Sequence, residues 1–431
     1  MKAIGIGLLG FGTVGAGVVA GLQRRQDLLA HRLGAEIRLR RIADVDLVRD
    51  RGVIVDRALL TTAAREVIGD PAVQIVVELI GGSGVARDLT LAALRARKPV
   101  VTANKKLLAE HGEEIFGAAE QAGVDLYFGA SVGGGMPIIR VLREGLIGNE
   151  VRRILGILNG TCNYILTRME RDALTFDAAL RGAQEAGYAE ADPSLDVDGI
   201  DTAHKAAILA SLAYGFHVPM AAIPVEGIRG LAALDVQYAR ELGYRIKLLA
   251  VITRDEAGVA VRVHPALVPL DHMLASVNQV FNAVMVQSDP AGDTLYYGRG
   301  AGRDPTASTV IGDIADVARN LISGRARYRR GVSLTGQPLP LQPLSALRSR
   351  YYFRLMVLDK PGSLGCFTGI LGRHGVSISA VTQRDVPQQG GFVPVVVLSH
   401  TAHEAEVDAA LAEIHAAGIV GERPVKLRML D

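Results

Sequence analysis

The segment 185–209 combines acids and a lysine in a pattern suited to proton-transfer chemistry. Its apolar helical run carries Lys205 four residues after Asp201, which is about one helical turn. Lysines seldom stand in apolar helices without a partner or a task. Acids around such a lysine suit a ligand with an amino group, whereas the alternative is a solvated acidic loop followed by an ordinary ion pair. The acids are Glu185, Glu190, Asp192, Asp196, Asp198 and Asp201.

A second pattern, a GxGxxG motif, predicts dinucleotide binding. It follows the strand-like stretch 3–9 and opens a helix, which is the context that the motif requires. The first glycine permits a tight turn, the second lets the backbone approach a pyrophosphate, and the third permits close packing of helix on strand. The residues predicted to bind the cofactor here are Gly10, Phe11, Gly12, Thr13, Val14 and Gly15.

The residues after the next strands bear on the cofactor and the substrate. Asp44, at the end of the second strand, would bond a ribose 2′-hydroxyl and so favours NAD. Arg40 or Arg41 could instead reach a 2′-phosphate, and both NAD and NADP stay open. Lys105 follows a later strand, 99–102, and would face the crevice where ligands bind in open α/β sheets.

Composition limits the class of protein. The chain has 431 residues, 49% of them hydrophobic and 21% charged, as expected for a globular protein of two or three domains. Its net charge is +2 and its basic residues are scattered, so we expect no nucleic-acid partner. No apolar run reaches the ~18 residues of a membrane span. Cys162 and Cys366 lie far apart without metal-ligand spacing, which indicates a cytoplasmic protein.

The order of predicted elements indicates an α/β protein of three parts. Strands and helices alternate over 1–130, which predicts a Rossmann-type doubly wound parallel sheet, with helix 306–323 packing back on it. We expect an α+β catalytic and dimerisation domain at 131–323 and a linker rich in proline and arginine at 324–351. Residues 352–431 read as strand, helix, strand, strand, helix, strand.

Seven motifs together resemble homoserine dehydrogenase, in that family's order and spacing over residues 1–323. The segment from 352 resembles an ACT domain, a βαββαβ module that senses amino acids. The motifs are GFGTVG, VVELIGG, VVTANKKLLAEHG, ASVGGGMPIIRVL, GILNGTCNYILTRM, GYAEADPSLDVDGIDTAHKAAIL and GRGAGRDPTASTVIGDIADVAR.

The resemblance implies an enzyme that interconverts L-aspartate 4-semialdehyde and L-homoserine with NAD or NADP, in threonine, methionine and isoleucine biosynthesis. It implies Lys205 as acid/base, Lys105 near the reacting carbonyl and the nicotinamide, and Asp201 as the group that orients Lys205. The resemblance further implies that Glu190 and Asp196 bind the substrate ammonium. It implies that Asn159, Gly160 and Thr161 bind the substrate carboxylate, and that Gly187 and Gly302 contact the cofactor. Helix capping is the alternative for Asn159 and Thr161, and a loop hinge for Gly302.

The family resemblance also implies a sodium site, but this chain lacks one of its ligands. Many relatives place a glutamate where this chain has Gly129, beside carbonyls equivalent to those of Val132, Gly134 and Met136. Because one negative ligand is missing, we expect sodium binding to be weak or absent. L-threonine is the effector expected at the ACT domain, and a homodimer or homotetramer is expected because ACT modules usually pair.

Two other functions would fit parts of this sequence. A prephenate dehydrogenase would also join a Rossmann domain to an ACT domain, but its chemistry requires a histidine base and arginine clamps. A non-catalytic amino-acid sensor is the other alternative, against which the retained Lys105, Glu190, Asp201 and Lys205 argue.

Overall fold

The computed structural model describes residues 2–324, 334, 336–384 and 391–430. The chain divides into two compact units, each built from three separate segments. The first unit comprises Met1–Leu158, Ala203–Ile223 and Phe281–Leu339, and the second comprises Asn159–Thr202, Pro224–Val280 and Pro340–Asp431. The predicted substrate domain, 131–323, is therefore shared between the two units. Residues 325–333 and 335 of the predicted linker lie outside the described residues.

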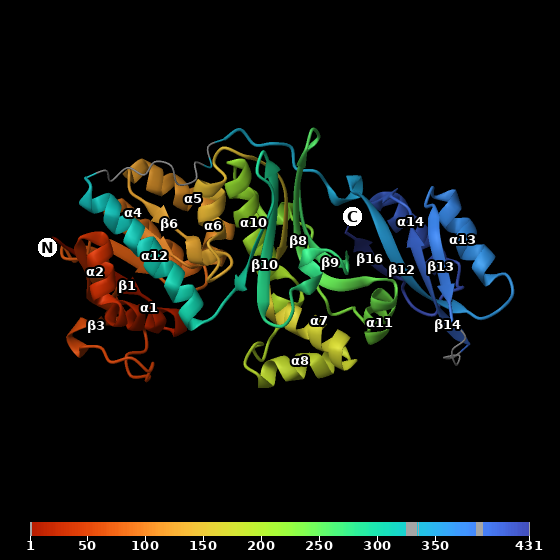
Figure 1. Cartoon of the computed structure of the whole chain (residues 1–431), viewed down its shortest axis with the longest axis horizontal. Helices are drawn as coiled ribbons and strands as arrows, with labels where there is room; N and C mark the ends of the chain where they lie inside the picture. Colours follow the sequence, from red (N-terminus) through yellow and green to blue (C-terminus); the bar gives the residue numbers. More distant parts are fainter. Residues whose placement is uncertain (1, 325–333, 335, 385–390, 431) are drawn as a thin grey trace. The chain divides into compact units, whose positions relative to one another are not determined.

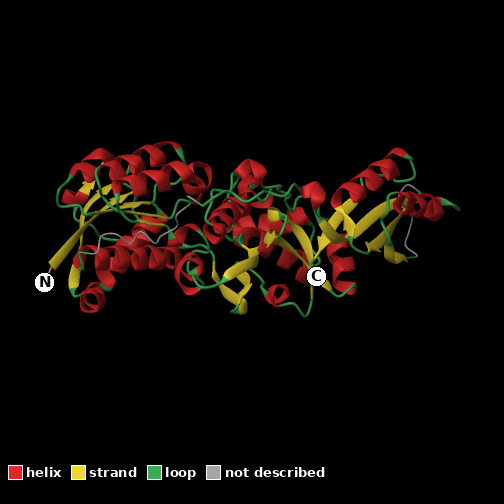
Figure 2. Cartoon of the chain, turned by 90° about the horizontal axis from the view of Figure 1, so that it is seen from above, coloured by secondary structure: helices red, strands yellow, loops and turns green. Residues whose placement is uncertain are grey.

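The first unit begins with the predicted doubly wound sheet (Figure 1). Six parallel strands take the order β3-β2-β1-β4-β5-β6, and helices cover both faces of the sheet (Figure 2). This strand order is the one that binds dinucleotides at the point where it reverses, beside β1 and β4. The elements are β1 (Lys2–Leu9), α1 (Thr13–Arg24), α2 (Gln26–Leu33), β2 (Ala35–Ala43), η1 (Arg57–Leu59), β3 (Leu60–Thr61), α3 (Ala64–Gly69), β4 (Ile75–Glu78), α4 (Gly84–Arg95), β5 (Val100–Thr102), α5 (Lys105–Ala122) and β6 (Leu126–Tyr127).

The first unit continues with helical turns, a strand from the middle of the chain and two later strands. In its second sheet segment β10 pairs antiparallel with both β7 and β11. The sequence patterns did not predict β3 or β11, because β3 has two residues and β11 is a sheet-edge strand with no buried residue. The elements are η2 (Gly129–Ser131), α6 (Ile138–Arg140), η3 (Val141–Gly145), β7 (Glu150–Ile157), the larger part of α10 (Ile200–Tyr214), η4 (Met220–Ala222), β10 (Phe281–Asp289), β11 (Gly292–Arg299) and α12 (Arg303–Ile322).

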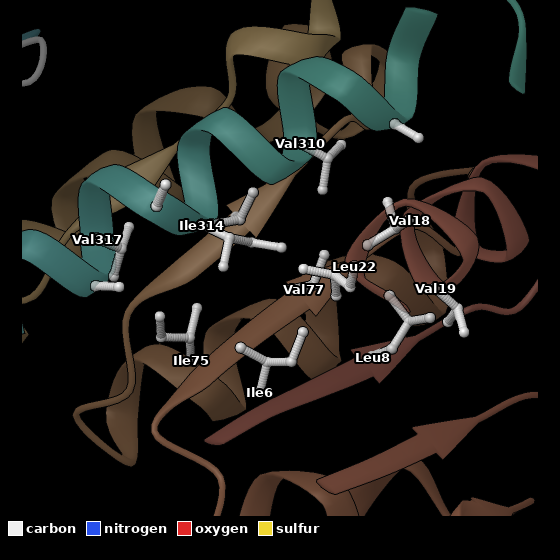
Figure 3. Packing of buried hydrophobic residues seen from close by; sticks show 14 of the residues in the cluster. Ile6, Leu8, Val18, Val19, Leu22, Ile75, Val77, Val310, Ile314 and Val317 are labelled. Carbon is white, nitrogen blue, oxygen red and sulfur yellow. The ribbon is translucent and has the colours of Figure 1, made fainter. Parts of the chain in front are cut away.

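The core of the first sheet draws on a helix from far along the chain. Residues of α12 pack with α1 over the alternating inward side chains of β1 and β4 (Figure 3). The contributing residues include Ile6, Leu8, Val18, Leu22, Ile75, Val77, Val310, Ile314 and Val317, all of them buried. Burial of apolar surface stabilises this arrangement by about 25 cal/mol per Å².

The second unit holds helices that bear the acid-rich loop and a mixed sheet in the order β8-β9-β16-β12-β14-β13. Its last strands and helices form the predicted βαββαβ module, and β16 joins that module to β9 by parallel pairing. The elements are α7 (Gly160–Asp172), α8 (Phe176–Glu185), α9 (Ser194–Val197), α11 (Ala233–Glu241), β8 (Tyr244–Asp255), β9 (Gly258–Pro269), η5 (Met273–Ser276), η6 (Leu344–Ala346), β12 (Arg348–Leu358), α13 (Ser363–Arg373), β13 (Ile378–Gln383), β14 (Phe392–Ser399), β15 (Ala402–His403), α14 (Glu404–Ala416) and β16 (Val425–Met429).

The predicted fold class is confirmed, with differences at element ends. β12 starts at Arg348, inside the range expected to be linker, because Arg348 and Ser349 pair with the short strand β15. The ACT core lies between the sheet and its two helices, where Phe353, Phe367 and Ile414 are fully or almost fully buried. None of the helices in the described residues is long and apolar enough to cross a membrane.

Candidate active site

The glycine-rich turn between β1 and α1 leaves open space above one glycine. A side chain at Gly10, whose φ is +95°, would come within 2.6 Å of the Leu79 carbonyl oxygen. A side chain at Gly15 would come within 2.3 Å of the Gly10 carbonyl oxygen, so neither position accepts another residue. At Gly12, the N-cap of α1, no described atom lies within 4 Å of the added carbon. The turn therefore fits a pyrophosphate at the helix N-terminus, flanked by buried Phe11, exposed Thr13 and half-buried Val14.

Asp44 joins the end of β2 to the glycine-rich turn. Its Oδ2 accepts a hydrogen bond from the Phe11 amide at 2.5 Å, and its Oδ1 accepts from the Asp46 amide at 2.9 Å. Arg51 lies beside it, with Nη2 3.3 Å from Asp44 Oδ1 and with its guanidinium 5.0 Å from the centre of the Phe11 ring. Sequence reasoning missed Arg51, because nothing in its loop marks which of several arginines returns to the strand end.

The two arginines that sequence reasoning did name lie elsewhere. Arg41 pairs with Asp70 at 3.5 Å, in the loop that enters β4 at the beginning of the strands. Arg40 falls at a register shift between β1 and β2, and its Cγ lies 3.0 Å from where a side chain at Gly5 would begin. Neither side chain is engaged at the strand end that carries Asp44.

A network of polar side chains places Lys105 as the first residue of α5. Glu78, buried at the end of β4, accepts a hydrogen bond from Thr102 Oγ1 at 2.6 Å, and burial raises the pKa of its carboxyl. Thr102 Oγ1 accepts from the Asn104 amide at 3.0 Å, and Asn104 caps α5 by accepting from the Leu107 amide at 3.1 Å. Glu78 belongs to the VVELIGG motif, and Thr102 and Asn104 belong to VVTANKKLLAEHG. The sequence patterns did not predict a site role for any of these three residues.

Lys205 is buried in α10, with 6% of its surface exposed. Its ammonium donates a hydrogen bond to the Leu158 carbonyl at 2.6 Å, at the end of β7. Ala203, Ala206 and Ala207 around it are buried, as the apolar composition of the segment predicted. Asp201, 5% exposed, stands one turn earlier in the same helix. Leu158 directly precedes Asn159, the first residue of the predicted substrate loop, in the sequence.

Asn159 forms hydrogen bonds with two of the acids in the second unit. Its Nδ2 donates to Asp196 Oδ1 at 2.7 Å and to Asp201 Oδ2 at 2.9 Å. Its Oδ1 caps α7 by accepting from the Cys162 amide at 2.8 Å. The Thr161 hydroxyl donates to the Tyr188 carbonyl at 2.7 Å, which ties the helix start to the acid-rich loop. Capping thus occurs at Asn159, and it orients the first turn of α7.

Two other acids of the loop, Asp192 and Asp198, are engaged in different contacts. Asp192 accepts hydrogen bonds from the Ser194 hydroxyl and amide, which lower the pKa of its carboxyl. Asp198 pairs with Arg229 at 2.5 Å. Glu185 and Glu190 are exposed, and Gln184 Nε2 donates to the Glu190 carbonyl at 3.2 Å. Asp192 and Asp198 are therefore engaged apart from Asp196 and Asp201.

The two remaining predicted glycines lie at helix ends. Gly187, with φ +73°, follows α8 and is exposed. Gly302, with φ +122°, is the N-cap of α12 and accepts from the Thr306 amide at 3.1 Å. The next residue, Arg303, has its carbonyl oxygen 2.9 Å from where a side chain at Gly17 of α1 would begin. The start of α12 thus lies against the helix that follows the glycine-rich turn.

The loop 129–136 contacts α12. The Gly129 amide donates to Asp313 Oδ2 at 2.8 Å, and the Gly134 carbonyl accepts from the Thr309 hydroxyl at 2.7 Å. Val132 and Met136 are buried. Among the described residues, no group of three or more histidine, cysteine, aspartate or glutamate side chains could hold a metal ion.

The doubly wound sheet, its glycine-rich turn, Lys105 at the start of α5 and the buried Lys205 within α10 are typical of a nicotinamide-dinucleotide-dependent oxidoreductase. Three family models match the chain: the NAD-binding domain of homoserine dehydrogenase over 10–129, homoserine dehydrogenase over 137–315, and the ACT domain over 351–418. The chain belongs to the homoserine dehydrogenase family, whose members are NAD(P)-dependent oxidoreductases acting on a CH–OH group.

Individual relatives match over their full length. The homoserine dehydrogenase of Neisseria gonorrhoeae is 43% identical, and that of Pseudomonas aeruginosa is 42% identical; each match covers 100% of this chain and 99% of the relative. The crystal structure of the Thiobacillus denitrificans enzyme has a TM-score of 0.94 and 43% identity, covering 100% of this chain and 99% of that one. A hyperthermophilic archaeal homoserine dehydrogenase in complex with NADPH has a TM-score of 0.62 and 28% identity, covering 73% of this chain and 98% of that one.

Proposed function

We propose that this homoserine dehydrogenase interconverts L-aspartate 4-semialdehyde and L-homoserine with Lys205 as its acid/base. A bound nicotinamide cofactor supplies or accepts the hydride. The observation that carries the proposal is the buried ammonium of Lys205, held by the Leu158 carbonyl at 2.6 Å next to the predicted substrate loop. From such a position it can give a proton to the aldehyde oxygen and recover it from the alcohol. Asp201 orients Lys205, and Lys105 binds near the reacting carbonyl.

The substrate is proposed to bind between the first turn of α7 and the acid-rich loop. Asn159, Gly160 and Thr161 receive its α-carboxylate, since a helix start offers backbone amides and a favourable dipole. Glu190 and Asp196 bind the α-ammonium. The hydrogen bonds of Asn159 to Asp196 and of Thr161 to the Tyr188 carbonyl support this role, because they join the start of α7 to the acid-rich loop.

For the cofactor we propose a preference for NAD over NADP. The Asp44 carboxylate at the end of β2 would repel a 2′-phosphate. Arg51 next to it donates to the carbonyls of Phe11, Asp46 and Arg49, so its donors are engaged within the loop. Gly187 and Gly302 approach the cofactor in this proposal, and Gly302 does so from the start of α12, close to α1.

The function is tested by homoserine-dependent reduction of NAD⁺ and NADP⁺, compared between the wild type and Lys205→Ala. Removal of a general acid/base typically costs ~10²–10⁴-fold in turnover. Lys106→Ala is the matched control, since this half-exposed lysine pairs on the surface with Glu110. Turnover of Lys205→Ala within a few-fold of wild type would remove Lys205 from the mechanism. Absence of homoserine oxidation by the wild type would reject the function itself.

We further propose that monovalent-metal binding at the carbonyls of Val132, Gly134 and Met136 is weak or absent. The Gly134 carbonyl already accepts from Thr309, which supports this view. Activity should be equal in sodium, potassium and a bulky organic cation at matched ionic strength. A requirement that sodium alone satisfies would contradict the proposal.

The ACT domain is proposed to bind L-threonine and inhibit the enzyme. A cavity of about 180 Å³ lies at the Asp359–Leu364 turn and the start of α13. Ser363 Oγ in its lining is buried and has no hydrogen-bond partner among the described residues. Helix amides and a hydroxyl suit an amino-acid carboxylate. Inhibition by L-threonine that is lost in Ser363→Phe would support the site, and wild-type indifference to threonine, methionine and isoleucine would reject it.

A route from this domain to the substrate loop lies within the second unit. Arg428 of β16 is 2% exposed and donates to both Glu226 oxygens, at 2.8 and 2.9 Å. Two residues on, the Ile228 amide donates to the Val197 carbonyl at 2.8 Å, and a side chain at Gly227 would come within 2.2 Å of the same oxygen. Val197 ends α9, which also carries Asp196. A shift of β16 would therefore be passed on to the acid that contacts Asn159.

We propose the following domain organisation and assembly. Residues 1–130 form the dinucleotide-binding domain, 131–323 the substrate and dimerisation domain, 324–347 a linker, and 348–431 the regulatory domain, which begins with β12. The protein acts as a homodimer or homotetramer in the cytoplasm, in threonine, methionine and isoleucine biosynthesis. Size-exclusion chromatography with light scattering would test the oligomeric state.

A further inference from the structure

Lys247 of the second unit is a buried lysine. It lies in β8 with 2% of its surface exposed. Its ammonium donates to Asn163 Oδ1 at 3.0 Å, to Asn278 Oδ1 at 3.3 Å and to the Val277 carbonyl. All three acceptors are neutral oxygens. In the described part of the chain no carboxylate comes within the 4.0 Å of an ion pair with Lys247, so this charge is hydrogen-bonded but not neutralised.

Such a charge is expensive to keep, because burial penalises an ammonium that lacks a counter-charge. Burial lowers the pKa of Lys247 to about 7, against a smaller opposite effect of the Glu170 carboxylate. Glu170 itself is paired with Arg245 at 2.8 Å, on the same strand as Lys247. A methionine or leucine would fill the space at a lower cost, so the ammonium indicates a task that needs a cation.

The acceptors of Lys247 connect α7 to the loop that precedes β10. Asn163 Nδ2 donates to the same Val277 carbonyl at 3.1 Å, and the Gln279 amide donates to Thr167 Oγ1 at 3.0 Å. Gln279 adopts φ +59°, which is uncommon for a residue with a side chain and is sustained here by this network. The loop 277–280 is therefore clamped along the first two turns of α7.

The loop 277–280 also contacts Gly160, the first residue of α7. A side chain at Gly160 would begin 2.8 Å from the Val280 carbonyl oxygen, so the loop and the helix start are in close contact. Gly160 lies one turn before Asn163, which is the helical residue that Lys247 contacts. The position of the loop thus determines where the amides of the first turn of α7 lie.

We propose that Lys247 is a positioning residue for the substrate α-carboxylate: it clamps the 277–280 loop against α7 and sets a buried cation behind the first turn of that helix. This inference rests on the proposed binding of the carboxylate by Asn159, Gly160 and Thr161. The anion supplies the missing counter-charge, which explains why the lysine is kept among neutral acceptors. Lys247 acts through Asn163 and the loop, and it makes no contact with the reacting atoms.

The proposal is tested by steady-state kinetics of Lys247→Met, with Arg245→Met as the matched control. Arg245 is a cation on the same face of β8, and it holds Glu170 and the Ala275 carbonyl. Lys247→Met should raise the KM for L-homoserine about 10- to 100-fold, the range for loss of an interaction with a charged group. The KM for the dinucleotide should stay within twofold. Arg245→Met should leave both constants within threefold.

A second readout uses the unmodified protein. The wild-type KM for homoserine should rise several-fold as pH increases from 6.5 to 8.5, because Lys247 loses its proton near pH 7. The charged groups acting on Lys247 are Glu170 from α7 and Arg245 from β8. The rise should be absent from Lys247→Met. If that variant does not fold, Asn278→Ala, which removes one acceptor of the clamp, should raise the same KM by a smaller factor.

The outcomes separate this inference from the proposed function. A homoserine KM within threefold of wild type in Lys247→Met, or a flat wild-type pH profile, would overturn the role of Lys247 while homoserine oxidation continues. An equal fall in kcat and equal rises in both KM values for Lys247→Met and Arg245→Met would show a merely structural role. Failure of the wild type to oxidise homoserine would instead reject the proposed function.

Discussion

The Gly129 amide donates a hydrogen bond to the carboxylate of Asp313 at 2.8 Å, across 184 residues of sequence. A side chain at Gly129 would begin 2.9 and 3.0 Å from the two Asp313 oxygens. Asp313 of α12 therefore fills the space that a larger residue at 129 would need. Burial raises the pKa of the Asp313 carboxyl to about 6, opposed in part by the Gly129 amide and by Arg143 and Arg140.

Asp313 should make stability depend on pH. Its folded-state pKa of about 6 lies above the ~3.9 of an unfolded chain, so the fold prefers the protonated form. This contribution is present below about pH 4 and is lost as pH rises through 6. Asp313→Asn keeps an oxygen for Gly129 and removes the charge. We expect it to raise the free energy of unfolding by about 1–3 kcal/mol at pH 8 and to bring no gain at pH 4.

Urea unfolding at both pH values checks this prediction, and Asp316→Asn serves as the control on the same helix. Asp316 is paired with Arg140 and Arg319, so its neutralisation should lower stability at pH 8. The two variants should shift the unfolding midpoint in opposite directions. A loss of stability in Asp313→Asn at pH 8 would mean that Arg140 and Arg143 outweigh burial at this carboxyl.

The sequence predicted the fold well because its signals are local. Alternating strand and helix patterns and the GxGxxG context specify the doubly wound sheet, and the apolar surroundings of Lys205 predict its burial. The missing parts depend on contacts between distant segments. Nothing near Asp313 indicates that Gly129 lies beneath it, and Arg51 is one of several arginines in its stretch of chain.

The acid-rich loop illustrates the same limit within a single motif. Six acids in one segment suggested one pocket, whereas the structure uses Asp192 and Asp198 for contacts with Ser194 and Arg229. Only the folded loop distinguishes these from Asp196, which reaches Asn159. Lys247 was not singled out either, since a lysine in a strand pattern is usually exposed.

Glu190 should control substrate affinity rather than the chemical step. Its exposed carboxylate is proposed to bind the α-ammonium, so Glu190→Gln should raise the KM for L-homoserine by about 10-fold or more and change kcat less. Glu185→Gln is the control, since this acid is also exposed at the other end of the same loop. Equal KM values for both variants and the wild type would assign Glu190 to the solvated surface.

Asp44 should determine the choice between the two dinucleotides. Asp44→Ser removes the charge that would repel a 2′-phosphate and leaves Arg51 free of its ion pair at 3.3 Å. We expect the ratio of kcat/KM for NADPH to that for NADH to rise by at least ~10-fold, which corresponds to about 1.4 kcal/mol. Arg41→Ser should leave the ratio unchanged, because Arg41 pairs with Asp70. A wild type that already prefers NADPH strongly would refute the proposed NAD preference.

Glu226 should couple the ACT domain to the substrate loop. Glu226→Gln removes the negative charge that pairs with Arg428 in the segment that contacts α9. Arg428 keeps its pairing with Glu404. We expect the concentration of L-threonine for half inhibition to rise about 5-fold or more, with uninhibited kcat and KM within threefold.

The matched control is Glu422→Gln, because Glu422 pairs with Arg354 of β12 at 2.8 Å without leading into residues 226–228. That control should keep the wild-type response to threonine. Equal responses in both variants would exclude this route but leave threonine binding intact. If the wild type itself ignores threonine, the inhibition proposed for the ACT domain fails before the route can be tested. Coupling carried by Arg428 and Glu226 therefore requires both a threonine-sensitive wild type and a selective loss in Glu226→Gln.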